Sequence, residues 1–76
     1  MSKQYKCWLS IRGSKFMDYG YVDNQYLEDL IHSKFVKKVR FYKRGSIFFL
    51  SYWYENSYYE KEHILLKIEG EIDGLN

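Results

Sequence analysis

The chain has 76 residues, with 12 Lys and Arg against 10 Asp and Glu for a net charge of +2, and a single cysteine. One cysteine excludes a disulfide-stapled secreted mini-protein, and no apolar run approaches the ~20 residues of a membrane span. With 46% apolar and 21% aromatic residues, the chain is too apolar to be disordered. The polar start leads straight into a strand pattern, so we expect no signal peptide and a cytoplasmic protein, in the host cell if the source is viral.

Alternation with a period of two predicts a first strand over 5–12. The core face of this strand would carry every second residue, namely Tyr5, Cys7, Leu9 and Ile11. Trp8 would then point to the other face. Gly13 ends the strand, and 15–21 is expected to be an irregular connection.

A helix is predicted over 24–35. Asp23 is a good N-cap, and Val22 and Leu27 are spaced as a hydrophobic staple around the helix start. Apolar residues then recur at helical spacing, namely Leu27, Leu30, Ile31 and Phe35. This stripe predicts an amphipathic helix that packs on a core.

Three further strands are expected in the second half of the chain. The second begins at 39–42, and Gly45 supplies the positive φ of a tight turn. Residues 47–54 are apolar on both faces, which is typical of a central strand. A fourth strand follows over 58–68, and 69–76 is expected to be a frayed tail.

The order β-α-β-β-β indicates a single α+β domain over 1–76. We expect one amphipathic helix packed on one face of a four-stranded, mostly antiparallel sheet, with the first two strands parallel if they are neighbours. Nothing in the sequence covers the other face. The 16 aromatic residues could serve to enlarge a small core, but a domain of this size cannot hide them all, so several are expected on the surface.

Charge is segregated along the chain, and 34–44 holds six cations and no acid. This block spans the predicted helix end, the second strand and the turn, so we expect one contiguous basic patch. Either it binds nucleic acid or an acidic protein surface, or it is a solvated edge strand guarded against aggregation.

One local pattern is close to a nucleic-acid-binding motif. RNA-binding sheets stack bases on aromatic residues of two strands, and their third-strand signature begins with Lys or Arg followed by Gly. Here Arg44, Gly45 and Phe48 fit part of that signature, and Trp8 could be the partner ring. The second helix of that fold is missing, because only 55–57 lies before the last strand. Packing in the core or at an edge is the alternative role for such rings.

Catalytic patterns are weak. Glu28 and His32 have the spacing of an exposed helical pair, and His63 lies on a strand face opposite the neighbouring acids Glu60 and Glu62. Cys7 is predicted to be an inert buried thiol. We therefore expect no enzyme, no metal and no cofactor.

The first hypothesis is a small non-catalytic interaction protein that covers a partner's surface. The surplus of aromatic residues, the segregated charge and a composition that suggests an AT-rich genome (no alanine, no proline) make it similar in kind to accessory proteins with which phages block host enzymes or defence complexes. Acidic residues would mimic phosphates in one version, with Asp18, Asp23, Glu28 and Asp29 in one region and Glu55, Glu60 and Glu62 in another.

The alternative is a nucleic-acid-binding module, and a homodimer through the uncovered face is compatible with both. We expect no membrane partner. The predicted partner- or nucleic-acid-binding residues are Trp8, Lys37, Lys38, Arg40, Lys43, Arg44, Phe49 and Trp53.

Overall fold

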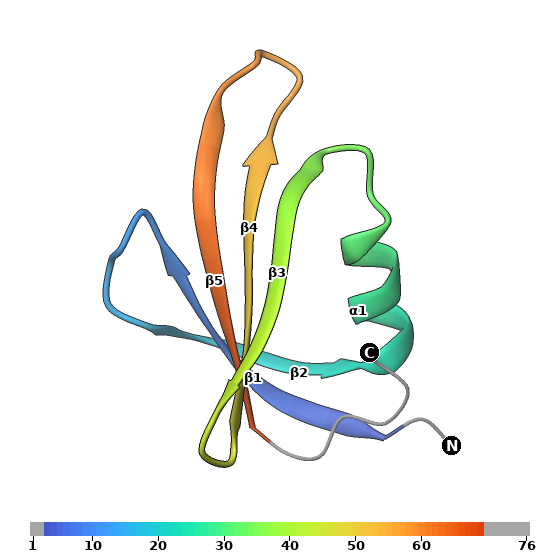
Figure 1. The fold of residues 1–76 in the computed structure, drawn as a ribbon, viewed down its shortest axis with the longest axis vertical. Helices are drawn as coiled ribbons and strands as arrows, with labels where there is room; N and C mark the ends of the chain where they lie inside the picture. Colours follow the sequence, from blue (N-terminus) through green and yellow to red (C-terminus); the bar gives the residue numbers. More distant parts are fainter. Residues whose placement is uncertain (1–2, 70–76) are drawn as a thin grey trace.

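The computed structural model describes residues 3–69, which form one five-stranded sheet and one helix (Figure 1). The elements are β1 (Gln4–Ile11), β2 (Met17–Asp23), α1 (Asn24–Ile31), β3 (Val36–Arg44), β4 (Ile47–Glu55) and β5 (Lys61–Glu69). The strand order is β2-β1-β5-β4-β3, and every neighbouring pair is antiparallel. The α+β class is confirmed, whereas the prediction of four strands is wrong. The predicted tail lies outside the described residues except for Glu69, which ends β5.

The additional strand is β2, in the segment that the sequence led us to expect as an irregular connection. Opposite β1, Gly20 pairs with Cys7 and Asp18 pairs with Trp8, so Tyr19 is an extra residue in a bulge. Gly20 has a φ of +95°, and its N–H donates to the Asp18 carboxylate at 2.8 Å. The bulge interrupts the alternation of side chains, and that alternation is the signal by which a strand is recognised in sequence.

The hairpin of β1 and β2 changes the topology that we expected. Because β2 returns beside β1, the chain enters the helix from the sheet edge rather than from β1. The strand after the helix, β3, then lies at the opposite edge and never meets β1. The predicted parallel contact between these two strands is therefore absent. As predicted, β4 lies in the interior of the sheet, between β3 and β5.

The helix begins where predicted and ends four residues early. The Asp23 carboxylate accepts the N–H of Tyr26 at 2.8 Å, which confirms the N-cap. After Ile31 the chain turns, because the Ser33 hydroxyl accepts the N–H of Phe35 and the Ser33 carbonyl accepts the N–H of Val36. Phe35 keeps the helical spacing in sequence but lies outside the helix, with 38% of its surface exposed.

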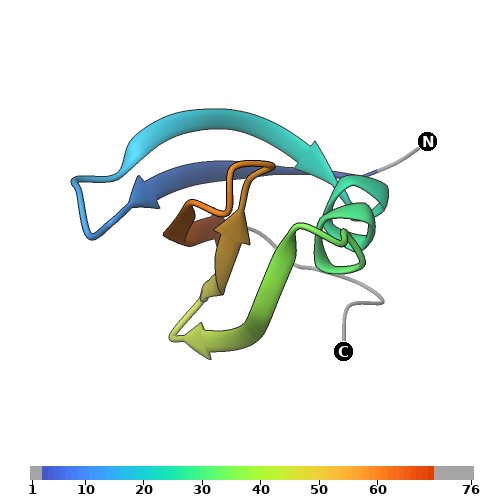
Figure 2. The same ribbon diagram turned by 90° about the horizontal axis from the view of Figure 1, so that it is seen from above.

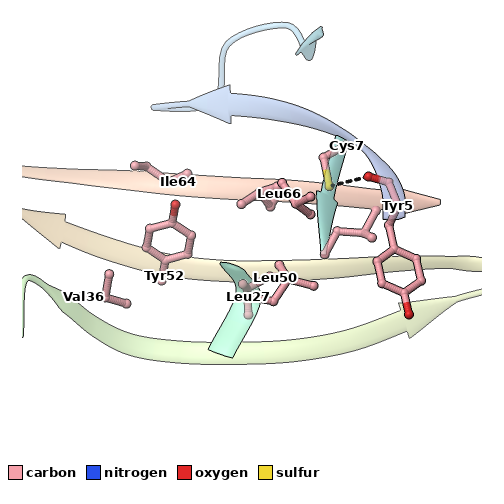
Figure 3. Close-up of a cluster of buried hydrophobic side chains, with 10 residues drawn as sticks. Tyr5, Cys7, Leu27, Val36, Leu50, Tyr52, Ile64 and Leu66 are labelled. Carbon is pink, nitrogen blue, oxygen red and sulfur yellow. Dashed lines mark hydrogen bonds between the residues drawn. The ribbon is translucent and has the colours of Figure 1, made fainter. Parts of the chain in front are cut away.

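The core lies between the helix and the concave side of the sheet, which curls around the helix (Figures 2 and 3). The predicted alternation of β1 is confirmed, since Tyr5 and Cys7 are buried and Leu9 and Ile11 pack against the core. Leu27 is the buried residue of the helix. The full buried cluster is Tyr5, Cys7, Val22, Leu27, Val36, Leu50, Tyr52, Ile64, Leu66 and Ile68.

Aromatic residues contribute little to this core. Of the 16 in the chain, Tyr5 and Tyr52 are the buried ones, and most of the others are exposed. Aliphatic side chains from β4, β5 and the helix fill the remaining volume. Core building therefore does not account for the aromatic surplus. Within residues 3–69, no helix is long and apolar enough to cross a membrane.

Leu27→Ala is expected to lower the free energy of unfolding by about 2–4 kcal/mol, the usual cost of a cavity at a buried leucine. Leu27 is 1% exposed, whereas Leu30 is only partly buried against the core. Urea denaturation followed by circular dichroism measures both variants. A larger loss for Leu30→Ala than for Leu27→Ala would contradict the packing of the helix described here.

Candidate binding face of the sheet

The convex side of the sheet, which we call the open face, lies opposite the core. Residues paired across antiparallel strands point to the same side, so the register assigns each side chain to a face. One row crosses four strands, from Tyr42 on β3 through Phe49 on β4 and Lys67 on β5 to Trp8 on β1. A neighbouring row holds Arg40 beside Ser51. Rings and cations thus lie side by side on a face that the helix does not cover.

The register brings six of the eight predicted site residues to this face, namely Trp8, Lys37, Arg40, Arg44, Phe49 and Trp53. Lys43 is not among them. It pairs with Phe48 on the core side of the sheet, and its ammonium lies 5.4 Å from the centre of the Phe48 ring. Lys38 belongs to a bulge between Lys37 and Arg40 and has a φ of +54°.

The basic segment 34–44 is therefore divided rather than contiguous. Successive residues of a strand point to opposite faces, which separates Lys43 from its neighbour Arg44. The prediction of a single patch followed the charges along the chain and left out this alternation.

A cluster of lysines and rings occupies one side of the open face around Trp8. The Lys67 ammonium lies 5.0 Å from the Trp8 ring centre and 5.6 Å from that of Phe16. The Lys6 ammonium lies 5.7 Å from Trp8 and 5.2 Å from Tyr21. Contacts of this kind attract the cation to the ring face. Trp8 is therefore held between two lysines of its own chain.

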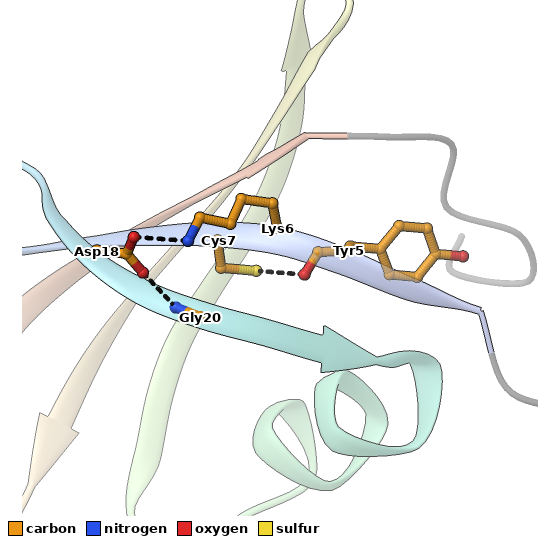
Figure 4. A network of polar contacts seen from close by, with 5 residues as sticks. All are labelled: Tyr5, Lys6, Cys7, Asp18 and Gly20. Atoms are coloured by element: carbon orange, nitrogen blue, oxygen red, sulfur yellow. Dashed lines mark hydrogen bonds and ion pairs between the residues drawn. The ribbon is translucent and has the colours of Figure 1, made fainter.

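Lys6 also ties the cluster to β2. Its ammonium donates to the Asp18 carboxylate at 2.6 Å, and the other oxygen of that carboxylate accepts the Gly20 N–H (Figure 4). The hydrogen bond from Lys6 lowers the pKa of Asp18. This carboxylate therefore stays ionised and serves the structure of the bulge.

Sequence reasoning missed most of this cluster. Lys6 shares the period-two face of Trp8, and Lys67 alternates with Leu66 and Ile68, so both could have been placed on the open face. Phe16 and Tyr21 could not, because they flank or belong to the unrecognised strand β2.

Two ring pairs lie further along β4. Tyr42 and Phe49 stack with centroids 5.4 Å apart and ring planes 16° apart. Trp53 meets His63 in a T-shaped contact at 5.2 Å, and His63 Nε2 hydrogen-bonds the Ser51 hydroxyl at 2.8 Å. His63 therefore has a structural role in holding the Trp53 side chain.

Cations outnumber acidic residues on the open face. Its cations are Lys6, Lys37, Arg40, Arg44, Lys61 and Lys67. The acidic residues lie toward the margins, and two of them are already engaged, Asp18 with Lys6 and Asp23 as the helix cap. The face therefore offers ammonium and guanidinium groups beside flat rings, a combination suited to binding anions with aromatic parts.

The one cysteine is sealed in the core. Cys7 is fully buried, and its thiol donates to the Tyr5 carbonyl at 3.7 Å (Figures 3 and 4). Burial raises the pKa of this thiol to about 11. A thiol that is neither ionised nor accessible is a poor nucleophile. Among residues 3–69, no group of three or more His, Cys, Asp or Glu side chains is placed to hold a metal ion.

A search of protein-family models, of curated proteins and of solved structures found no match for this chain. The open face itself is therefore the basis for inferring a function.

The buried thiol makes stability depend on alkaline pH. In the unfolded chain the Cys7 thiol ionises near pH 9, whereas in the folded chain it keeps its proton until about pH 11. The unfolded state loses a proton first, so the free energy of unfolding falls as the pH rises from 9 to 11. Urea denaturation at several pH values should show this decrease in the wild type and a smaller one in Cys7→Val. Equal slopes for both proteins would contradict the assignment.

Proposed function

We propose that this chain is a non-catalytic binding module whose open face binds single-stranded nucleic acid. The observation that carries the proposal is the row of Tyr42, Phe49, Lys67 and Trp8 across four adjacent strands, on a face that no helix within residues 3–69 covers. Proteins that bind single strands combine aromatic platforms for the bases with cations for the backbone.

The chemistry of the two partners is complementary. A base that stacks on an aromatic side chain contributes about 1–3 kcal/mol to binding, and Phe49 and Trp8 are both partly exposed. Lys67 lies within this row between Phe49 and Trp8, and Arg40 lies in the neighbouring row, so each could contact a phosphate beside a stacked base. A duplex buries the faces of its bases within its own stack, so the proposal favours single strands over double strands.

The lysines around Trp8 also support single-strand binding. Lys6 and Lys67 lie over rings in the free protein. A base that stacks on Trp8 displaces an ammonium from the ring, and that ammonium then meets the phosphate beside the base. Each lysine thus exchanges one electrostatic partner for another, which limits the cost of desolvating it.

Fluorescence anisotropy with labelled single- and double-stranded DNA and RNA tests the proposal at low and physiological salt. Binding should favour single strands and weaken steeply with salt. Phe49→Ala and Trp8→Ala are each expected to weaken binding by about fivefold to 100-fold, the equivalent of one lost stack. Sedimentation equilibrium of the free protein shows beforehand whether a second copy covers the open face.

A matched pair of variants checks the face itself. Arg44→Gln removes a cation from the open face, and Lys43→Gln removes its neighbour from the core side of the same strand. Arg44→Gln should weaken binding and reduce the salt dependence by about one counterion, whereas Lys43→Gln should change little. Equal effects of the two variants, or no binding at low salt, would refute the proposal.

A protein partner is the second candidate, and the edge strand β3 favours it. From Lys37 to Arg44 this strand is exposed, and it carries five cations at the edge of the described sheet. An acidic extended segment could add to it as a further strand, with main-chain hydrogen bonds and charge complementarity. A small inhibitor that covers the surface of a host enzyme, as phage accessory proteins do, would act through such an edge.

The phosphate-mimic version of that idea has less support. Asp18 is paired with Lys6, and Asp23 caps the helix, so neither carboxylate is free to imitate a phosphate. Titration with a peptide of alternating Glu and Val, followed by amide NMR signals, tests the edge. Shifts confined to β3 would support a protein partner, and shifts scattered over the sheet would argue against strand addition.

A further inference from the structure

A hollow at one end of the open face combines a tryptophan with three lysines. It has a volume of about 550 Å³ and is lined by Lys37, Lys38, Trp53, Glu55 and Lys61. These residues come from the start of β3, the end of β4 and the start of β5. The volume falls in the range of sites for small organic ligands, about 300–1,000 Å³.

The sheet register builds this hollow. Lys37 pairs with Trp53, and Glu55 pairs with Lys61, so these four side chains are cross-strand neighbours. The fifth, Lys38, belongs to the bulge of β3 and has the left-handed φ of +54°. A bulge re-aims a side chain relative to its strand. Here the extra residue adds a third ammonium to a site that regular pairing would supply with two.

The tryptophan is held but not covered. Trp53 is 40% exposed, and its contact with His63 is T-shaped. His63 in turn is fixed by its hydrogen bond to the Ser51 hydroxyl at 2.8 Å. Trp53 is therefore a positioned ring with free surface toward the hollow.

The charge of the hollow identifies the type of ligand. Three lysines and one glutamate give a net charge of +2. A phosphodiester inside a strand carries one negative charge, whereas a phosphate monoester carries about 1.5–2 at neutral pH because its second pKa is about 6. A second hollow beside the first adds Lys34 and shares Lys37 and Glu55 with it.

We propose that the hollow binds the end of a nucleic-acid strand that carries a terminal phosphate, with the last base stacked on Trp53 and the monoester held by Lys37, Lys38 and Lys61. The inference rests on the proposed function, and it adds that the module recognises a phosphorylated strand end. Glu55 lies opposite Lys61 on the neighbouring strand.

Three single-stranded oligonucleotides of one sequence, each labelled on an internal base, test the inference. One carries a 5′-phosphate, one a 3′-phosphate and one hydroxyl groups at both ends. One phosphorylated form should bind about tenfold more tightly than the hydroxyl form, the size of one added charge-assisted hydrogen bond. The gain should shrink as the pH falls from 7.5 to 5.5, because the monoester gains a proton near pH 6.

Two variants locate the effect. Lys38→Gln combined with Lys61→Gln should abolish the preference for the phosphorylated end. Because Lys61 is also a cation of the open face, affinity for the hydroxyl form should fall by no more than the loss of one phosphate contact. Lys43→Gln combined with Lys15→Gln is the matched control, since neither residue lines the hollow, and it should keep the preference. Trp53→Ala should weaken binding of the phosphorylated form, with its fold checked by circular dichroism.

The outcomes separate the two proposals. Equal binding of all three oligonucleotides, or a preference that survives the loss of Lys38 and Lys61, would overturn the terminal-phosphate site and leave single-strand binding in place. No binding of any oligonucleotide at low salt would overturn both.

Discussion

The antiparallel pairing of β1 with β5 is the constraint on which the rest of this structure depends. It joins the N-terminal hairpin and helix to the C-terminal meander, and it places Cys7 beside Ile68 and Leu9 beside Leu66 in the core. The same register places Trp8 beside Lys67 on the open face. Because strand side chains alternate, a slip of one residue would exchange the two faces and expose the core residues. The burial of the aliphatic side chains therefore also fixes the positions of the binding residues.

Regular alternation was the part of the fold that could be predicted from the sequence. It gave the core face of β1 and the interior position of β4. Prediction from regular alternation failed at the two bulges. At Tyr19 the bulge hid a whole strand, and with it the topology and half of the Trp8 cluster. At Lys38 the bulge shifts the register of the basic segment, and the charges along the chain do not reveal this shift.

For the helix the error was the opposite, because the sequence pattern predicted more regular structure than the chain forms. Its start depends on a local hydrogen bond from the Tyr26 N–H to the Asp23 carboxylate, and the sequence reveals this cap. Its end depends on Ser33, whose hydroxyl and carbonyl both accept backbone N–H groups and turn the chain toward β3. Serine competes in this way with helical hydrogen bonding, whereas the apolar spacing to Phe35 suggests continuation. Local hydrogen bonds therefore outweighed periodicity at the point where the two signals disagreed.

The aromatic surplus has an electrostatic as well as a hydrophobic explanation. A core that uses only Tyr5 and Tyr52 leaves the other rings at or near the surface, where exposed apolar patches favour aggregation. Lysines over Trp8, Phe16 and Tyr21 cover part of this surface with charge while leaving the rings in place. A negatively charged ligand with flat aromatic parts can replace these internal contacts one for one. The arrangement that covers the exposed rings with charge is thus also the one through which the proposed nucleic-acid strand would bind.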